Sequence, residues 1–103
     1  MIEIRQTRVF ADWRAGLRDD VVRKRIGARI DRLAFGNFGD AKSIGGGISE
    51  LRLNFGPGFR LYFTRRGEML VVLLCGGDKS TQKRDIAEAK RLARELEGDE
   101  HGD

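Results

Sequence analysis

The chain contains few of the residues that build metal centres and disulfide bonds: its 103 residues include one Cys, one His and one Pro. A single Cys cannot form an internal disulfide or a thiolate zinc cluster, and a single His cannot form a His-based metal site. No apolar run approaches the roughly 18 residues that span a bilayer, and residues 1–5 lack the apolar core of a signal peptide. We therefore expect a cytoplasmic protein that uses no metal and no cofactor and does not bind membranes.

The distribution of charge divides the chain into a basic body and an acidic end. Residues 97–103 carry four acidic residues and no Lys or Arg, so residues 1–96 hold 20 basic residues against 12 acidic ones, a net charge of +8. We expect one domain over residues 1–96 and a disordered acidic tail over residues 97–103. A body this basic is typical of proteins that bind polyanions such as nucleic acid, but it is equally typical of a surface kept soluble by its charge.

The hydrophobic pattern of the first forty residues is helical after a short strand. Residues 1–6 alternate between apolar and polar side chains and predict a strand. Thr7 is a suitable N-cap for a first helix, and Asp19 or Asp20 for a second helix that ends before Gly36. Both predicted helices carry an apolar stripe at helical spacing. The outer face predicted for the second helix contains Arg23, Lys24, Arg25, Arg29 and Arg32.

From residue 40 onward the pattern alternates, which predicts strands. Gly-Pro-Gly at 56–58 predicts a turn between strands at 50–55 and 59–64. Residues 69–75 are apolar on both faces, as in a central strand that is covered on both sides. A last helix follows, with Ser80 or Thr81 as its N-cap. The predicted fold is therefore an α+β domain with a mainly antiparallel sheet, two N-terminal helices and a C-terminal helix.

The predicted sheet brings one carboxylate and several basic or polar side chains to one surface. Strand alternation and chain order place six residues there: Lys42, Glu50, Arg52, Arg60, Tyr62 and Lys79. Such a group suits phosphodiester cleavage, in which a base removes a proton from the attacking hydroxyl and cations stabilise the transition state. The cations would also lower the pKa of the carboxyl group. The alternative is a row of cross-strand ion pairs, which the spacing alone favours.

Three other features have simpler structural interpretations. Trp13 lies in an apolar helical stripe and is expected in the core rather than on a base-stacking surface. Cys75 ends a hydrophobic strand and is expected to be a buried, inert thiol. Three glycines at 45–47 lack the Lys-Ser/Thr of a P-loop and are expected to form a loop or bulge.

Three segments resemble the RelE/ParE toxin superfamily: residues 50–52 (Glu-Leu-Arg), 56–63 (Gly-Pro-Gly-Phe-Arg-Leu-Tyr-Phe) and 74–82 (Leu-Cys-Gly-Gly-Asp-Lys-Ser-Thr-Gln). They are most similar to its branch of addiction-module killer proteins, the HigB-like toxins, as are residues 29–33 and 36–40. The resemblance extends over residues 2–96. It implies the RelE-like fold, in which two N-terminal helices and a C-terminal helix pack around a mainly antiparallel sheet of four to five strands.

The resemblance also implies an activity and the residues that perform it. RNA-cutting members are metal-independent, ribosome-dependent endoribonucleases that cleave mRNA in the ribosomal A site, where the 2′-hydroxyl attacks the adjacent phosphate. By this resemblance, Arg60 contacts the scissile phosphate, and Lys79 stabilises the transition state or the leaving group. Glu50 occupies the position of the general base in some members, and Arg52 binds phosphate.

The remaining residues implied by the resemblance would bind RNA around this centre. Lys42 would contact phosphate, and Tyr62 would stack on a base or position it. Asp78, Gln82 and, as a weaker candidate, Asp85 lie nearby in the sequence.

The resemblance implies several partners and leaves other functions open. A small helix-turn-helix antitoxin, the ribosome and mRNA are the expected partners, with operator DNA bound only by the toxin–antitoxin complex. One alternative is a non-catalytic ParE-like toxin that binds and poisons DNA gyrase, and another is an inactive toxin relic. A third is a general RNA-binding module, although the predicted sheet lacks the interleaved aromatic residues of such a surface.

Overall fold

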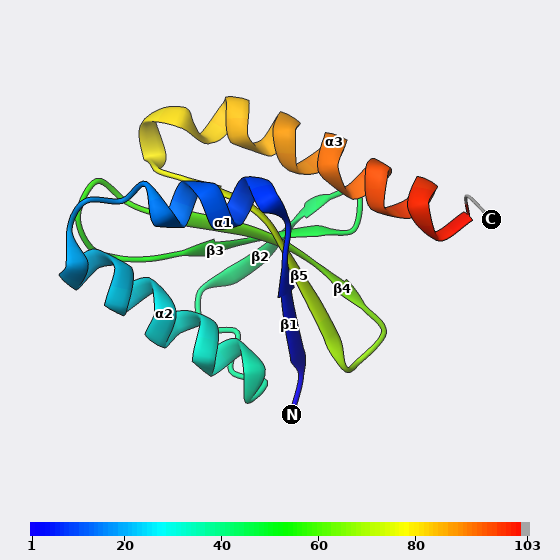
Figure 1. Ribbon diagram of the computed structural model, residues 1–103, viewed down its shortest axis with the longest axis horizontal. Helices are drawn as coiled ribbons and strands as arrows, with labels where there is room; N and C mark the ends of the chain where they lie inside the picture. The colour runs from blue at the N-terminus through cyan, green and yellow to red at the C-terminus, as the bar shows by residue number, and fades with distance from the viewer. Residues whose placement is uncertain (102–103) are drawn as a thin grey trace.

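A computed structural model describes the backbone of residues 1–101 and the side chains of residues 1–98. Helices and strands follow one another in the predicted order (Figure 1). In chain order they are β1 (Glu3–Gln6), α1 (Arg8–Ala15), α2 (Asp20–Ala34), β2 (Ala41–Gly45), β3 (Ile48–Arg52), β4 (Arg60–Arg66), β5 (Leu70–Gly77), the 3-10 helix η1 (Lys79–Thr81) and α3 (Gln82–His101). The predicted α+β class is confirmed.

The strands form one sheet in the order β1-β5-β4-β3-β2. Strands β2 to β5 are an antiparallel meander, as predicted, whereas β1 pairs in parallel with β5. The sheet is therefore mixed, because α1 and α2 intervene between β1 and the meander and return the chain to the opposite edge. Strand β5 lies between β1 and β4 and is buried on both faces, which confirms the meaning of its continuous apolar run.

Helices cover both faces of this sheet and divide the core into two clusters. On one face, α1 and α2 contribute Phe10, Ile26 and Leu33 to a cluster with the strands. On the other face, α3 contributes Ala89 and Leu92. Figure 1 shows α3 along one side of the sheet and α2 along the other. The sheet thus has no open face in its centre, and functional surfaces are confined to its edges and to the connecting loops.

The N-caps of the first two helices are those that the sequence predicts, but the cap of the third is not. Thr7 accepts a hydrogen bond from the Phe10 amide, and Asp19 accepts one from the Val21 amide. The residue expected to cap the last helix was Ser80 or Thr81. Instead, Asp78 caps η1, because its carboxylate accepts a 2.8 Å hydrogen bond from the Ser80 amide. Helix α3 then begins at the end of η1.

Helix α3 reaches into residues 97–103, for which the sequence predicts a disordered acidic tail. Its backbone is helical as far as His101. No Pro interrupts this segment, so the hydrogen-bonded ladder of α3 propagates through it. Residues 102–103 lie outside the described residues. Within the described chain, no helix is both long and apolar enough to cross a bilayer.

The close approach of α1 to β5 depends on a glycine. A Cβ atom on Gly76 would overlap the Trp13 ring, which packs on this part of the strand. The indole of Trp13 lies 5.7 Å from the Phe10 ring and 6.3 Å from the Phe59 ring. The expectation that this tryptophan belongs to the core is therefore confirmed.

Candidate functional site

The register of the meander places the predicted site residues in two rows across the sheet. In the first row, Lys42 lies opposite Glu50, which lies opposite Tyr62. In the second row, Arg52 lies opposite Arg60. The predicted sharing of one face is confirmed, because directly paired residues project to the same side. However, α3 covers most of this face, so it is not the open surface that the alternation suggests.

Glu50 is the buried centre of this arrangement, with a side chain that is 0% exposed. One carboxylate oxygen accepts a 3.0 Å hydrogen bond from Arg52 Nε, and the other accepts a 2.8 Å hydrogen bond from Gln82 Nε2. Arg60 Nε lies 3.9 Å from the second oxygen as an ion-pair partner. The carboxylate is therefore held by β3, β4 and the start of α3 together.

The surroundings of Glu50 keep it ionised. Burial by itself raises the pKa of a carboxyl group, but the hydrogen bond from Gln82 and the hydrogen bond and charge of Arg52 outweigh burial. The charge of Arg60 acts in the same direction, and the pKa of Glu50 lies below its ordinary value. A lowered pKa and two occupied oxygens make a poor proton acceptor and a strong anchor for the two guanidinium groups.

A cleft opens beside these arginines at the β3–β4 turn. It has a volume of about 510 Å³. We call it the hairpin cleft and define it by its lining: Asp40, Arg52, Leu53, Asn54, Phe55, Gly56, Pro57, Gly58, Arg60 and Lys79. Three of the four residues predicted to be catalytic thus line one cleft, and the fourth, Glu50, is bound behind it.

The cations of the hairpin cleft are held in different ways. Arg60 is 8% exposed, and its Nη1 donates a 2.7 Å hydrogen bond to the Gly58 carbonyl, which fixes it to the turn. Its Nε is buried and lacks a hydrogen-bond acceptor among the described residues. Lys79 is exposed at the first residue of η1, with its Cβ next to Gly58. The cleft therefore combines a buried, hydrogen-bonded guanidinium with an exposed ammonium group.

None of the four predicted RNA-binding residues, Lys42, Tyr62, Asp78 and Gln82, lines the hairpin cleft. Tyr62 is 0% exposed, so its ring cannot stack on a base in this conformation. The side chain projects under α3 rather than into solvent, and burial, together with the charge of Glu50, raises its hydroxyl pKa. Lys42 is exposed on β2, outside the cleft lining. Its place beside Glu50 in the register leaves it on the flank of the site.

The residues at the start of α3 have structural partners. Gln82 binds Glu50, as described above, and Asp78 caps η1. The hydrogen bond from Ser80 lowers the pKa of Asp78, which keeps this cap ionised. Asp85 is 6% exposed and accepts a hydrogen bond from the Thr81 hydroxyl. These contacts attach the first turns of α3 to the rim of the hairpin cleft.

A second basic pocket, which the sequence did not predict, lies between α2 and the end of β3. Arg29 was expected on the solvent-exposed face of α2, but it is 9% exposed and turned toward the sheet. Its Nη2 donates a 3.0 Å hydrogen bond to the Phe38 carbonyl. The helical spacing of Arg25, Arg29 and Arg32 was the available signal, since residues three or four apart share one helix face. From the sequence alone, this arginine stripe is predicted on the solvent-exposed face of α2, because charged side chains usually face solvent.

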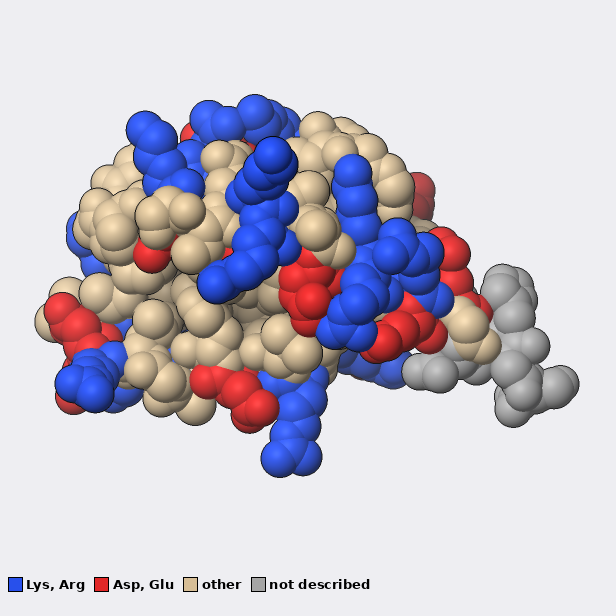
Figure 2. Space-filling view, turned by 90° about the horizontal axis from the view of Figure 1, so that it is seen from above, with Lys and Arg blue, Asp and Glu red and all other residues tan. Residues whose placement is uncertain are grey.

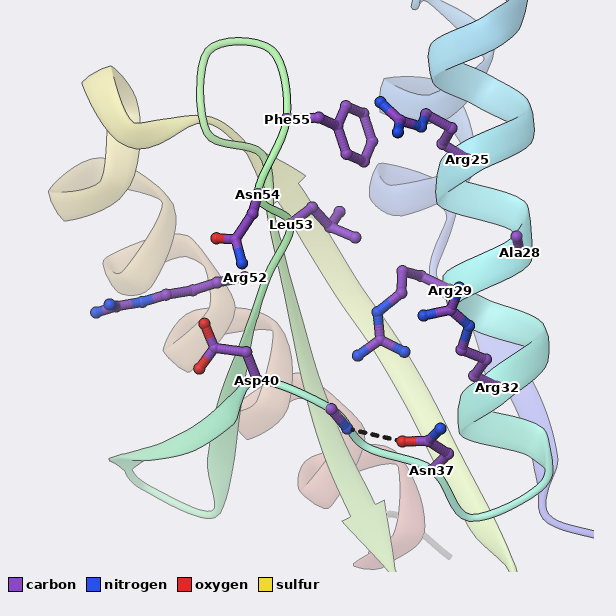
Figure 3. A pocket seen from close by; sticks show the side chains of 11 residues that line it. Arg25, Ala28, Arg29, Arg32, Asn37, Asp40, Arg52, Leu53, Asn54 and Phe55 are labelled. Atoms are coloured by element: carbon purple, nitrogen blue, oxygen red, sulfur yellow. Dashed lines mark hydrogen bonds between the residues drawn. The ribbon is translucent and has the colours of Figure 1, made fainter.

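This α2 pocket has a volume of about 370 Å³ and is shown in Figure 3. Its lining consists of Arg25, Ala28, Arg29, Arg32, Asn37, Gly39, Asp40, Arg52, Leu53, Asn54 and Phe55. Figure 3 shows the side chains of Arg52 and Asp40 directed away from α2, whereas Arg29 extends from the helix toward the strand. The α2 pocket and the hairpin cleft share Asp40 and residues 52–55, so they lie on the two sides of one segment.

The exposed side of α3 differs from these two basic hollows. Figure 2, which views the molecule from that side, shows acidic side chains among the basic ones. Arg91 forms ion pairs with Glu88 at 2.5 Å and with Glu95 at 2.6 Å. Charges that neutralise one another on a helix surface do not form a strong site for a polyanion. Among the described residues, no three His, Cys, Asp or Glu side chains gather as a metal site.

Comparisons with known proteins agree with the resemblance seen in the sequence. Residues 16–97 match the family model described as phage derived protein Gp49-like (DUF891). The chain belongs to this family. Gp49-like proteins are RelE/HigB-like toxins of type II toxin–antitoxin systems, and such a toxin has an antitoxin as its partner.

The chain is also similar to a protein from Haemophilus influenzae (strain ATCC 51907 / DSM 11121 / KW20 / Rd) over most of its length. This relative is described as an uncharacterized protein and is 52% identical over 95 residues. The alignment covers 92% of this chain and 96% of the relative. The similarity therefore spans the hairpin cleft, the α2 pocket and most of α3.

Proposed function

We propose that this Gp49-like toxin is a HigB-like endoribonuclease that cleaves mRNA on the cytoplasmic ribosome without a metal, inhibits translation and so arrests growth. The observation that carries the proposal is the hairpin cleft, because Arg52, Arg60 and Lys79 line one opening. A phosphodiester gains negative charge in its pentacovalent transition state, and cations fixed in advance stabilise that charge. Glu50 holds these two guanidinium groups in place, because its buried carboxylate forms ion pairs with both Arg52 and Arg60.

The proposed reaction transfers the phosphate within the RNA strand. The ribose 2′-oxygen forms a bond to the adjacent phosphorus as its proton passes to water, and the bond from phosphorus to the 5′-oxygen breaks. The departing 5′-oxygen takes up a proton, so the products are a 2′,3′-cyclic phosphate and a free 5′-hydroxyl. Arg60 and Arg52 bind the non-bridging oxygens, and Lys79 donates to the departing 5′-oxygen.

Glu50 has a positioning role in this proposal rather than the role of general base that the resemblance implies. Both of its oxygens accept hydrogen bonds, and its side chain is 0% exposed. A general base must reach the proton that it removes, and a hidden carboxylate does not. Arg52 is 36% exposed, so its guanidinium reaches from the buried carboxylate to the cleft.

The test is a translating extract in which mRNA 5′ ends are mapped by primer extension. We expect in-frame cuts with the wild type and none with the double variant Arg60→Ala/Lys79→Ala. The matched control is Arg18→Ala/Lys24→Ala, which removes the same charge from exposed residues outside both basic hollows and should keep the cuts. Because Arg60 also anchors the turn, Lys79→Ala alone is included, with thermal unfolding to verify its fold.

Absence of cuts with the wild type, together with growth arrest in cells, contradicts the nuclease proposal. It would favour the second candidate, a toxin that poisons DNA gyrase without catalysis, and a supercoiling assay then decides. The hidden position of Glu50 is the observation that favours this candidate, since no free carboxylate base faces the cleft. Absence of both cuts and growth arrest indicates an inactive relic.

The partner proposed for this toxin is a helix-turn-helix antitoxin encoded beside it. The toxin–antitoxin complex, rather than the toxin alone, would bind operator DNA. Co-expression should abolish the cuts in the extract, and the purified complex should shift a promoter fragment that the free toxin does not shift. A free toxin that shifts the fragment equally well would contradict this assignment.

A further inference from the structure

The α2 pocket contains three cations that form no close ion pair among the described residues, although the charge of Asp40 partly offsets that of Arg29. Within residues 1–98, no carboxylate forms an ion pair with Arg25, Arg29 or Arg32. The lining includes a single acidic residue, Asp40, whose side chain is directed away from α2 (Figure 3). Uncompensated like charges repel one another, so an anion in this pocket would stabilise all three.

Arg29 is the part of the pocket that indicates a ligand. The residue is about nine-tenths buried, and its Nη1 is buried without a hydrogen-bond acceptor in the described chain. Burial and the charge of Arg32 lower the pKa of Arg29, which means that its cation is held in unfavourable surroundings. A buried donor without a hydrogen-bond partner destabilises the fold, because it has lost its bonds to water. An anion that accepts from this nitrogen would offset that cost.

The backbone next to Arg29 is shaped to leave room for its guanidinium. Gly39 has φ +58°, and a Cβ atom at this position would overlap Arg29 Nη2. Any other residue would displace the guanidinium from the Phe38 carbonyl to which it is bonded. The pocket is thus a formed feature with a fixed cation at its base, and Arg25 and Arg32 stand exposed on its rim.

The position of the pocket favours a chain-like anion. The hairpin cleft and the α2 pocket flank the same segment, residues 52–55, with cations on both sides. Phe55 lines both hollows, and Arg25 stacks on its ring at 4.5 Å from the centroid. A single-stranded nucleic acid carries one phosphate per nucleotide and bases that stack on aromatic and guanidinium planes. It can therefore occupy both hollows at once.

We propose that the α2 pocket binds a second phosphodiester of the same single-stranded RNA whose scissile phosphate enters the hairpin cleft. This inference rests on the proposed function, because it uses the hairpin cleft as the place of cleavage. Arg29 binds the phosphate from the base of the pocket, and Arg25 and Arg32 close around it. The pocket then fixes the direction in which the strand crosses residues 52–55.

The test measures binding of a fluorescein-labelled, 2′-O-methyl RNA octamer, which cannot be cleaved, by fluorescence anisotropy at several salt concentrations. The variant Arg25→Gln/Arg32→Gln removes the two exposed rim cations and leaves the buried Arg29 in place. The control, Arg18→Gln/Lys24→Gln, removes two exposed cations outside the pocket lining. We expect the rim variant to bind roughly tenfold more weakly than the control and to lower the salt slope by about 0.7, since the pocket holds one phosphate and each phosphate contact to a single strand contributes about 0.7.

A third variant, Lys79→Ala, separates this inference from the proposed function. If Lys79→Ala weakens octamer binding and the rim variant equals its control, the inference is wrong and the proposed function stands. If only the rim variant weakens binding, the strand does not pass Lys79 in the hairpin cleft and the shared strand is refuted, whereas the proposed function is decided separately by the cuts that Lys79→Ala makes in the primer-extension assay. Loss of binding with both variants supports the shared strand.

Two further measurements test what occupies the α2 pocket. An octapeptide of glutamate, used as the probe, tests whether the pocket binds an acidic protein segment. Peptide binding that depends on Arg25 and Arg32, with unchanged RNA binding, would overturn the proposal. The guanidinium NMR signals of Arg29 provide a readout without substitution, and they should shift when the octamer is added. Unchanged Arg29 signals at saturating octamer would also refute it.

Discussion

Replacing Glu50 by Gln tests the claim that one hidden carboxylate holds the cations of the site in place. The amide has nearly the same shape as the carboxylate, so the substitution removes charge without creating a cavity. Its NH₂ group must then face the donor of either Arg52 or Gln82, which both hydrogen-bond to Glu50 in the wild type. One hydrogen bond is lost, and the neighbouring Arg60 loses its ion-pair partner.

The expected loss of stability follows from these contacts. A hydrogen bond to a charged group contributes about 1.5–3 kcal/mol, and removing one member of a buried ion pair costs roughly 3–5 kcal/mol. We therefore expect Glu50→Gln to lower the free energy of unfolding at pH 7 by about 3 kcal/mol. In a domain of this size that corresponds to a decrease in Tm of roughly 12 °C or more. The control Asp31→Asn, at an exposed carboxylate on α2, should change stability by no more than about 0.5 kcal/mol.

The pH dependence gives this prediction a second, independent readout. The pKa of Glu50 is lower in the folded protein than in the unfolded chain, so the unfolded state takes up its proton first as the pH falls. The stability that Glu50 contributes is complete above the unfolded pKa of about 4.3 and is lost as the pH falls through the folded value. The difference between wild type and Glu50→Gln should therefore shrink below pH 4.3 in thermal unfolding. A difference that stays constant from pH 7 to pH 3, or a variant as stable as Asp31→Asn, would refute the reasoning.

Four further predictions follow from other contacts in the structure. Gly76→Ala should lower the free energy of unfolding by about 2 kcal/mol or more, because the new methyl group overlaps the Trp13 ring. Gly98→Ala, where nothing lies within 4 Å of the added Cβ, should be neutral or stabilising by about 0.5–1 kcal/mol. If Gly76→Ala and Gly98→Ala changed the Tm equally, the close contact between Gly76 and Trp13 would be contradicted. Tyr62→Phe should leave RNA cleavage unchanged, because the ring is buried and does not line the hairpin cleft. Loss of cleavage in the primer-extension assay would restore a role in binding a base. Burial, together with the nearby Asp85 and Glu88, raises the pKa of the Cys75 thiol to about 12. Thiol reagents at pH 8 should therefore modify the folded protein far more slowly than the unfolded chain. Rapid modification of the native protein would show that β5 opens.

The periodicity of the sequence was sufficient for the order of the helices and strands. The alternation around Leu51 and Leu61 and the helical stripe of α2 each describe a face that local geometry defines, and these faces pack as predicted. The Gly-Pro-Gly turn likewise joins the two strands that the sequence assigns to it. The parallel partner of β1 was not predicted, because a periodic pattern says which side of a strand is buried and not which strand lies beside it.

The candidate site was predictable only in part. Alternation placed Glu50 and Arg52 on one face correctly, since the period of a strand is two. It gave no information on α3, which covers that face and hides both Glu50 and Tyr62. A polar residue in a strand is therefore predicted to be exposed unless the element above it is known. Arg29 was misplaced for the same reason, because only packing shows that one arginine of a basic helix turns inward.

By itself, the sequence determined the α+β class, the helical and extended segments, the basic balance of the body and the residues that surround the β3–β4 turn. These properties depend on local periodicity, on turn chemistry and on composition, which act over a few residues. Only the tertiary structure decided which charged side chains are buried, which are exposed and which contact residues distant in the sequence. Glu50 and Gln82 are 32 residues apart in sequence, yet the hydrogen bond between them joins the sheet to α3 behind the hairpin cleft. Such a contact exists only after both faces of the sheet have been covered, because burial and pairing of charge are properties of the packed molecule.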